Sequence, residues 1–300
     1  MSVVRLVAGC KVNLGLRVTG RRPDGYHELD SLFWPLPEPC DILELHPRQQ
    51  GGLKVVCPTE GIDPTHNTLT RTWAAFAEAT GQVSSQPPGL EVHLLKGIPH
   101  GAGLGGGSSD AAALLRWLNA QLPNPLPEED LARLAVRIGA DTPFFLQDSP
   151  CIVQGIGEVL TPVSPQFSDL WLTLVCPDIH ISTPWAFQEL DRLAPHAALP
   201  PPENSLTKPA SGANGNSLSG ARVVEGMHND LEEAVFPRYP RLAEIKGQLL
   251  HHGAIAAVMS GSGSSMLGLF SNAAAAGEAC STLGKAHGRA WCLPLACTGM

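Results

Sequence analysis

The sequence has no long hydrophobic run and no excess of positive charge. Among its 300 residues, no stretch approaches 18 consecutive uncharged apolar residues, so we expect no transmembrane helix and no membrane partner. Lys and Arg number 20 against 28 Asp and Glu, which gives a formal net charge of −8. This balance argues against a general nucleic-acid-binding protein, because such proteins need basic surface for phosphates. An anionic small molecule would therefore need a local binding site.

Cysteine pairs with metal-binding spacing are also missing. The eight cysteines include no Cys-x-x-Cys pair, and their spacings match no zinc motif. We therefore expect reduced, buried thiols in a cytoplasmic protein and no metal held directly by side chains. A hydrophobic content of 43% over 300 residues fits one large or two moderate globular domains. Whether the chain is a monomer or a homodimer stays open.

Glycine is concentrated in the segment Gly101-Ala-Gly-Leu-Gly-Gly-Gly-Ser-Ser109. The alternating residues 90–95 before it predict a strand, and the apolar spacing after it predicts a helix with an N-cap at Ser108, Ser109 or Asp110. Glycines let the backbone approach an anion closely, and the N-terminus of a helix attracts negative charge. A strand, a glycine loop and a helix in this order indicate a phosphate-binding loop.

The glycine segment alone does not decide which phosphate loop this is. Gly101, Gly103 and Gly106 satisfy G-x-G-x-x-G, so a dinucleotide-binding oxidoreductase is an alternative. Its ribose-binding acid is not found, however, because the window about 20 residues on holds the start of a helix at 127–130. No Lys-Ser or Lys-Thr follows the glycines, and the chain lacks the protein-kinase signatures. A catalytically silent binding module is the other alternative.

The rest of the chain mixes helices with strands, as in an α+β fold. The first half predicts strands at 3–7 and 12–18 and helices at 67–80 and 127–138. Residues 195–221, rich in Pro, Ala, Ser, Asn and Gly, predict a loose surface insert. The elements predicted for the second half are strands at 151–153, 158–160, 170–176, 255–259, 266–270 and 289–293, and helices at 183–193, 238–252 and 273–286.

The segment Pro99–Ser109 resembles the ATP loop of the small-molecule kinases named for galactokinase, homoserine kinase, mevalonate kinase and phosphomevalonate kinase, the GHMP superfamily. Residues Lys11–His27, with Asp-Gly-Tyr-His at their end, are similar to the branch that phosphorylates a cytidine-diphosphate-linked sugar alcohol in the non-mevalonate route to isoprenoids. Three further segments fall in the family's order: Gly139–Pro143, Asn229–Glu232 and Ser260–Gly263.

This resemblance implies a two-domain GHMP kinase fold with the active site in a cleft between the domains. An N-terminal ATP-binding domain would cover residues 1–162, and a C-terminal α/β sandwich domain would cover residues 163–300, with the low-complexity insert near 195–221. The implied activity is ATP-dependent phosphorylation of the cytidine-diphosphate-linked small molecule. A GHMP kinase acting on mevalonate or homoserine is the nearest alternative.

The resemblance also implies roles for the residues that react and hold ATP. Asp141 would take or orient the proton of the attacking hydroxyl, and Lys11 would pair with it and stabilise developing negative charge. The glycine loop would hold the ATP phosphates, with Mg²⁺ offsetting their charge, while Asn67 and Lys96 would contact the adenosine. The loop residues implied are Pro99, His100, Gly101, Ala102, Gly103, Leu104, Gly105, Gly106, Gly107, Ser108 and Ser109.

For the second substrate, the resemblance implies a cytosine platform. Tyr26 and Phe187 would sandwich the base, since aromatic faces suit any flat ring, and His27 would read its edge. Asn13 and Thr183 would contact other polar parts of this substrate. The small-residue segment Ser260–Ser265, with Gly261 and Gly263, would line its diphosphate, although a tight hairpin turn explains the same residues.

Overall fold

The computed structural model describes residues 3–81, 89–147, 149–193 and 217–295. The chain divides into two compact units, which do not follow the expected halves 1–162 and 163–300. The first unit comprises Met1–Cys10, Leu36–Pro99 and Gly105–Asp148, and the second comprises Lys11–Pro35, His100–Leu104 and Ser149–Met300. The chain therefore passes between the units several times, and residues near the N-terminus complete the second one.

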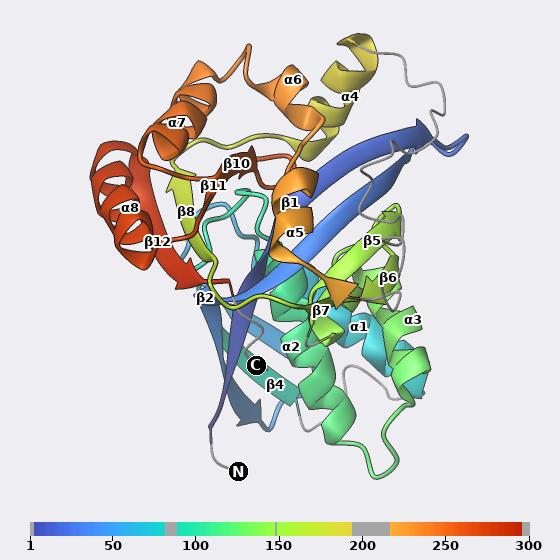
Figure 1. The fold of residues 1–300 in the computed structure, drawn as a ribbon. Helices are drawn as coiled ribbons and strands as arrows, with labels where there is room; N and C mark the ends of the chain where they lie inside the picture. The colour runs from blue at the N-terminus through green and yellow to red at the C-terminus, as the bar shows by residue number, and fades with distance from the viewer. Residues whose placement is uncertain (1–2, 82–88, 148, 194–216, 296–300) are drawn as a thin grey trace. The chain divides into compact units, whose positions relative to one another are not determined.

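Two long strands, β1 (Val4–Arg21) and β2 (His27–Arg48), contribute residues to both units (Figure 1). The prediction of two strands at 3–7 and 12–18 was wrong, because they form the single strand β1. The residues between them, Ala8 to Lys11, contain no turn-forming pair, and Ala8, Cys10 and Lys11 are all buried, so nothing breaks the extended chain.

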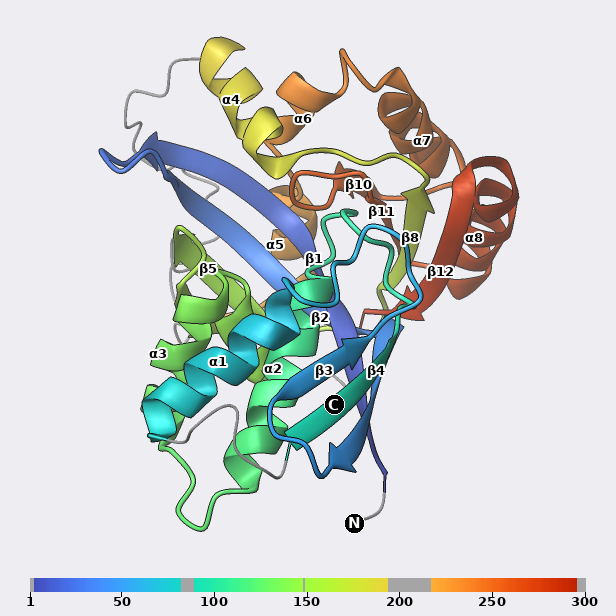
Figure 2. The ribbon, with the colours of Figure 1, turned by 180° about the vertical axis from the view of Figure 1, so that it is seen from behind.

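In the first unit, three helices pack together beside a small sheet (Figure 2). Strand β4 (Gly89–Leu95) pairs antiparallel with Ile42–Arg48 of β2 and parallel with β3 (Leu53–Val56). The helices are α1 (Thr68–Thr80), α2 (Gly106–Ala120) and α3 (Glu128–Ile138), followed by the short 3₁₀ helix η1 (Thr142–Leu146). Their apolar faces share one core with the sheet, which includes Leu43, Leu45, Leu69, Phe76, Leu114, Leu115, Leu134 and Ile138.

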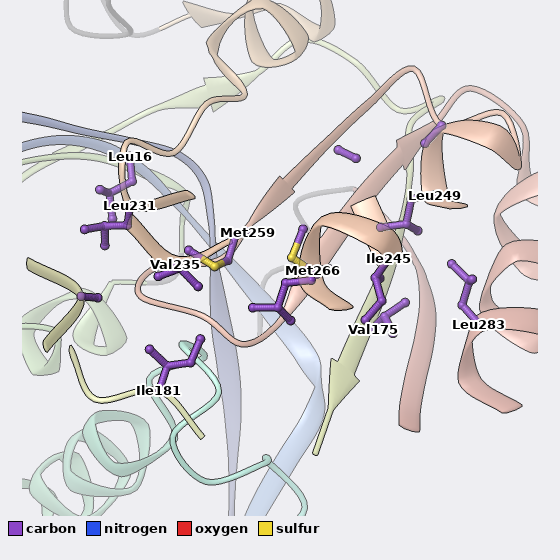
Figure 3. Close-up of a cluster of buried hydrophobic side chains, with 14 of the residues drawn as sticks. Leu16, Val175, Ile181, Leu231, Val235, Ile245, Leu249, Met259, Met266 and Leu283 are labelled. Carbon is purple, nitrogen blue, oxygen red and sulfur yellow. The ribbon is translucent and has the colours of Figure 1, made fainter. Parts of the chain in front are cut away.

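The second unit is built on a four-stranded antiparallel sheet covered by two helices. The sheet order is β10 (Ala256–Met259), β11 (Met266–Phe270), β8 (Trp171–Pro177) and β12 (Gly288–Pro294), and the covering helices are α7 (Pro240–His251) and α8 (Ala273–His287). Figure 3 shows its buried cluster, in which Leu16 of β1 lies among side chains from the sheet and helices. These elements confirm the strands predicted at 170–176, 255–259, 266–270 and 289–293 and the helices predicted at 238–252 and 273–286, with ends shifted by a few residues.

Smaller elements complete the second unit. Leu29–Phe33 of β2 pairs with β5 (Cys151–Gly155), β5 pairs with β6 (Val159–Pro162), and β7 (Ser164–Pro165) pairs with β9 (Ser217–Leu218). The unit also contains the helices α4 (Thr183–Leu193), α5 (Gly220–Gly226) and α6 (Leu231–Val235).

The predicted insert at 195–221 lies mostly outside the described residues, since only 217–221 are described. Those five residues are not loose loop: they form β9 and the start of α5. Ser219 caps α5 by accepting a hydrogen bond from the backbone N–H of Arg222, so the helix has a defined start that composition alone hides.

None of the helices within the described ranges has the length and apolar character needed to cross a bilayer.

Candidate active site

The glycine loop leads directly into α2. Gly101, Gly103 and Gly105 have φ values of 66°, 76° and 72°, in the left-handed region where a side chain costs energy. The helix begins at Gly106 with Gly105 as N-cap, so the expected N-cap at Ser108, Ser109 or Asp110 was wrong. Both serines lie inside the first turn instead. Because Gly105 has no side chain to cap the first-turn N–H groups, this helix start suits an external anion.

The segment Ser260–Ser265 joins β10 and β11 as a hairpin, and it also supports the glycine loop. The hydroxyl of Ser260 donates to the carbonyl of Gly103 at 3.2 Å, and the N–H of Ser265 donates to the carbonyl of Ala102 at 3.2 Å. A Cβ at Gly103 would lie 2.3 Å from the carbonyl oxygen of Ser260, so the two backbones are in close contact. The hairpin interpretation is confirmed, while a role in binding the substrate diphosphate stays a prediction.

Lys11 is a buried cation in the second unit, beside the glycine loop. Nζ of its side chain donates to Oδ1 of Asn13 at 2.6 Å and lies 4.2 Å from the ring centre of Phe33. Its backbone N–H donates to the carbonyl of Leu104 at 3.0 Å. A positive charge fixed next to a phosphate loop can stabilise a phosphoryl group in transfer.

Asn13 fixes this arrangement. Its Nδ2 donates to Oγ of Ser31 at 3.0 Å, and its backbone N–H donates to Oγ of Ser260 at 3.0 Å. Asn13 thereby connects Lys11, the strand β2 and the hairpin that supports the glycine loop. The structure brings Lys11, Asn13 and Gly103 together through these bonds, and contact between Asn13 and a substrate stays a prediction.

Asp141 lies in the first unit, at the N-cap of η1 just after α3. Gly139, the C-cap of α3, allows the chain to pass close to α2: a Cβ there would lie 3.1 Å from Oγ1 of Thr142 and 3.6 Å from Oγ of Ser108. The half-buried carboxylate of Asp141 is thus on a turn packed against the helix that follows the glycine loop. Its pairing with Lys11, a residue of the other unit, stays a prediction.

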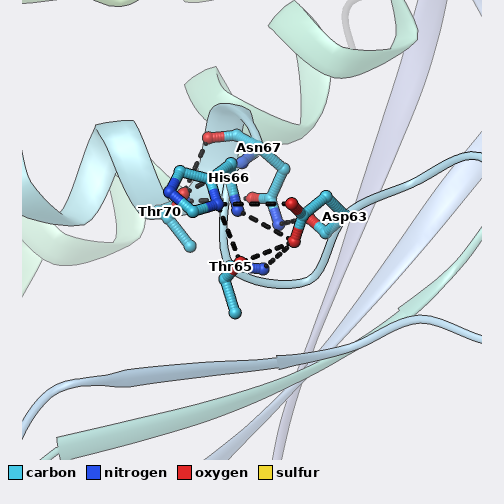
Figure 4. A network of polar contacts seen from close by, with 5 residues as sticks. All are labelled: Asp63, Thr65, His66, Asn67 and Thr70. Carbon is cyan, nitrogen blue, oxygen red and sulfur yellow. Dashed lines mark hydrogen bonds and ion pairs between the residues drawn. The ribbon is translucent and has the colours of Figure 1, made fainter.

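Asn67 caps helix α1 (Figure 4). Its Oδ1 accepts from the N–H of Thr70 at 3.0 Å, and its Nδ2 donates to the carbonyl of Asp63 at 2.8 Å. The same turn is closed by Asp63, which accepts from both the N–H and the hydroxyl of Thr65, and these bonds lower the pKa of Asp63 to about 2. The amide of Asn67 has a structural role, and its contact with adenosine stays a prediction.

Lys96 follows β4 and is buried between two carboxylates. Its Nζ donates to Asp110 of α2 at 2.9 Å and to Asp41 of β2, whose other oxygen accepts from the N–H groups of Gly97 and Ile98. Burial raises the pKa of Asp110 to about 7, against the lowering effect of Lys96. The pKa of Lys96 is raised, because the two carboxylates outweigh its burial. Nothing in the sequence spacing indicated Asp41 or Asp110 as its partners.

The aromatic residues expected around a base meet in the second unit. The ring of His27 stacks on Phe187 of α4 with centroids 4.7 Å apart and planes at 24°. Its Nε2 forms a hydrogen bond of 2.8 Å with Oδ1 of Asp191. Tyr26, on the turn before β2, is 60% exposed. The structure brings His27 and Phe187 together, while a sandwich of a base between Tyr26 and Phe187 stays a prediction.

Sequence reasoning missed Asp191. One signal could have found it, because Asp191 follows Phe187 by four residues on a predicted helix, and residues at this spacing share a face. Thr183, at the start of the same helix, contacts the hairpin through a hydrogen bond of 2.7 Å between its Oγ1 and Oγ of Ser262.

The segment Asn229–Glu232 stabilises the second unit around the hairpin. Nδ2 of Asn229 donates to the carbonyls of Met259 and Gly261, each at 2.7 Å. Asp230 accepts from the N–H of Val18 at 2.7 Å, and Glu232 accepts from the N–H of Met259 at 2.8 Å. These bonds give the segment a structural role in connecting β1 with the hairpin.

Comparison with known proteins assigns this arrangement to a family. The sequence matches the family model "GHMP kinases N terminal domain" over residues 67–149 and "GHMP kinases C terminal" over residues 214–290. The chain belongs to the GHMP kinases. Members of this family are ATP-dependent small-molecule kinases, and the predicted GHMP kinase fold of mixed helices and sheets is confirmed. The oxidoreductase alternative is excluded.

The chain is similar over most of its length to proteins named 4-diphosphocytidyl-2-C-methyl-D-erythritol kinase. It is 49% identical to one from Nitratidesulfovibrio vulgaris (strain DP4), with 89% of this chain and 90% of that one covered. It is 42% identical to one from Solidesulfovibrio magneticus, with 95% of each chain covered.

Solved structures agree with this relationship. A crystal structure of 4-(cytidine 5'-diphospho)-2C-methyl-D-erythritol kinase is 34% identical, with a TM-score of 0.74 and 97% of this chain and 98% of that one covered. A homoserine kinase from Cytophaga hutchinsonii has a TM-score of 0.72 at 18% identity, with 98% of this chain and 95% of that one covered, and shows the shared fold alone.

Proposed function

We propose that this chain transfers the γ-phosphoryl group of ATP to the 2-hydroxyl of 4-diphosphocytidyl-2-C-methyl-D-erythritol, within the non-mevalonate route to isoprenoid precursors. The 49% identity to a relative with this name over 89% of the chain supports the proposal. The observation that carries it is the stack of His27 on Phe187, with the exposed Tyr26 next to His27 in the chain. Aromatic faces and a polar ring at one place suit a nucleobase, which mevalonate and homoserine do not contain.

In this proposal the protein contributes position and charge, because phosphoryl transfer requires little covalent chemistry from the enzyme. The glycine loop and the first turn of α2 bind the ATP phosphates, and the buried ammonium of Lys11 stabilises negative charge on the group in transfer. Asp141 orients the 2-hydroxyl and accepts its proton. The hairpin at 260–265 keeps the glycine loop in place through Gly103.

Mg²⁺ belongs to the same proposal. The ion would bind together with ATP, and the hydroxyl of Ser108 in the first turn of α2 offers an oxygen donor of the kind that Mg²⁺ prefers. The ion would neutralise charge on the ATP phosphates. We further expect the protein to act in the cytoplasm, as a monomer or a homodimer, without nucleic-acid partners.

A coupled ADP-release assay tests the proposal. The purified protein is supplied with ATP and Mg²⁺ and with one acceptor at a time: the cytidine-diphosphate-linked substrate, mevalonate or homoserine. Turnover with the cytidine compound, and little with the other two, is the expected result. Equal or faster turnover with mevalonate or homoserine would assign the chain to another branch of the family.

A further inference from the structure

Asp191 holds His27 from one side in the second unit. Oδ1 of Asp191 is 2.8 Å from Nε2 of His27, and Oδ2 is 3.2 Å from Nη1 of Arg21. The side chains of His27 and Asp191 are 10% and 19% exposed, so water screens this pair only weakly. Arg21 offsets the charge of Asp191, and the carboxylate connects β1, β2 and α4.

This contact determines which nitrogen of His27 carries hydrogen. An ionised carboxylate can only accept, so the hydrogen bond to Asp191 requires a proton on Nε2 of His27. In the neutral ring, Nδ1 then carries a lone pair and can only accept. Among the residues that the structure describes, no side chain or backbone group is hydrogen-bonded to this Nδ1. A hydrogen-bond acceptor is therefore left for a ligand.

The same helix also fixes the plane of the ring. Phe187 and Asp191 lie one turn apart on α4, so one face of the helix supplies both the stacking surface and the carboxylate. Stacking restricts the tilt of the imidazole, and the hydrogen bond restricts its rotation about the ring normal. Together, the stacking and the hydrogen bond keep the acceptor Nδ1 of His27 pointing in one direction, as recognition of the edge of a planar base requires.

We propose that Asp191 is a positioning residue that makes His27 selective for cytosine over uracil. Cytosine carries an exocyclic amino group, a donor, at the position where uracil carries a carbonyl oxygen, an acceptor. Nδ1 of His27, kept as an acceptor by Asp191, bonds the amino group and repels the carbonyl. This inference rests on the proposed function, since it concerns the base of the proposed substrate.

The test measures the binding of CDP and UDP by calorimetry, since these two ligands differ only in the base. Three single variants are compared with the original chain. Asp191→Leu removes the acceptor at Nε2, whereas Asp191→Asn retains an amide oxygen that can still accept. Glu189→Gln is the matched control, because Glu189 lies on the same helix but pairs with the exposed Arg192.

We expect the original chain and Glu189→Gln to prefer CDP to the same degree. Asp191→Leu should reduce the ratio of CDP to UDP affinity by about tenfold or more, because a free imidazole can present a donor as well as an acceptor. Asp191→Asn should retain part of the preference. The KM for ATP should not change in any variant. An unchanged CDP to UDP ratio in Asp191→Leu, or an equal loss of both ligands, would overturn the proposal.

A direct measurement covers the case in which Asp191→Leu does not fold. Nitrogen-detected NMR of the histidine rings, with His27 assigned by the loss of its signals in His27→Gln, reports which nitrogen is protonated. Protonation at Nε2 alone in the original chain, and a mixture of forms in Asp191→Asn, is the expected result. A protonated Nδ1 in the original chain would overturn the proposal. An absence of turnover with the cytidine compound would overturn the proposed function instead. The NMR result does not depend on turnover, so the two failures can be distinguished.

Discussion

The cluster of Asp41, Lys96 and Asp110 places three ionisable groups in the interior of the first unit. Taking charges out of water is unfavourable, and one cation cannot balance two ionised carboxylates. The imbalance is relieved by the raised pKa of Asp110, at about 7, which arises mainly from its burial. Asp110 therefore takes up a proton in the folded protein at a pH where an exposed aspartate has lost it.

Asp110→Asn should change how stability depends on pH. Between about pH 4 and pH 7 the folded protein holds a proton at Asp110 that the unfolded chain has released, so this group's contribution to stability falls as pH rises. An asparagine does not titrate, so the variant lacks this decrease in stability with rising pH. Melting temperatures measured across this range should show the variant gaining on the original chain as pH increases.

The matched control for this prediction is Asp130→Asn. Asp130 is also in the first unit, but it is exposed and pairs with Arg133. Its melting temperature should follow that of the original chain across the pH range. Parallel curves for Asp110→Asn and the original chain would show that Asp110 does not hold a proton near neutral pH.

Asp141→Asn tests the proposed base. An amide cannot accept the proton of the attacking hydroxyl, so kcat should fall by roughly 10²–10⁴-fold. ATP affinity and the melting temperature should stay close to the original values, since the amide fills the same space. Steady-state kinetics and nucleotide titration measure both, with Asp130→Asn again as the control. Turnover near the original rate would remove Asp141 from the mechanism, and a loss of ATP affinity would make its role structural.

The sequence identifies candidate catalytic residues only where they belong to a motif of a known family. Lys11 and Asp141 came from the resemblance, and their burial and backbone settings followed from the structure. The partners of Lys96 could not be predicted, because Asp41 is 55 residues away in sequence and no local periodicity connects it to β4. Contacts of this kind depend on which strands become neighbours, and that choice is made by the whole fold.

At the scale of elements, strand β2 shows where pattern reading fails. No strand was predicted over 27–48. Pro35, Pro37 and Pro39 interrupt the segment, and proline cannot donate a hydrogen bond to a sheet, so the local pattern gives little sign of a strand. The structure places these prolines between two paired stretches, Leu29–Phe33 with β5 and Ile42–Arg48 with β4. Helices such as α3 and α8 were predictable because their apolar spacing and glycine ends are local signals.

The contact between the glycine loop and the β10–β11 hairpin makes a prediction about both elements. In Gly103→Ala, the new Cβ would lie 2.3 Å from the carbonyl oxygen of Ser260, at a φ of 76° that alanine resists. The loop must move away, which should destabilise the protein by about 1–3 kcal/mol and weaken ATP binding. Chemical denaturation and nucleotide titration measure these effects.

Gly247→Ala is the control for this substitution. Gly247 lies in α7, where a Cβ would meet nothing within 4 Å, so alanine should stabilise the helix by about 0.5–1 kcal/mol and leave ATP binding unchanged. Equal ATP affinity in Gly103→Ala and Gly247→Ala would show that the hairpin does not position the glycine loop.

At the scale of the whole molecule, the expected boundary at residue 162 does not match the compact units. A contiguous boundary is the natural prediction from composition, which changes near residue 150. Composition cannot show that Lys11–Pro35 belongs to the second unit, because this depends on contacts between residues that are far apart in the sequence. Leu16 and Val18 of this segment lie in the second unit's core cluster, and Leu29–Phe33 pairs with β5.

This organisation predicts that residues 163–300 do not fold alone. The fragment lacks Leu16 and Val18, which would leave Leu231 and Val235 without part of their apolar surroundings. It also lacks β5. Because it lacks the backbone N–H of Val18 as well, the half-buried carboxylate of Asp230 would lose one of its hydrogen-bond donors.

A second fragment, with residues 11–35 joined to residues 149–300 by a Gly/Ser linker, restores these partners. Thermal unfolding followed by circular dichroism should show a cooperative transition for the full chain, a weaker one for the linked fragment and none for residues 163–300. A cooperative transition in residues 163–300 near the melting temperature of the full chain would restore the contiguous boundary, because the N-terminal segment would then contribute little to the second unit's stability.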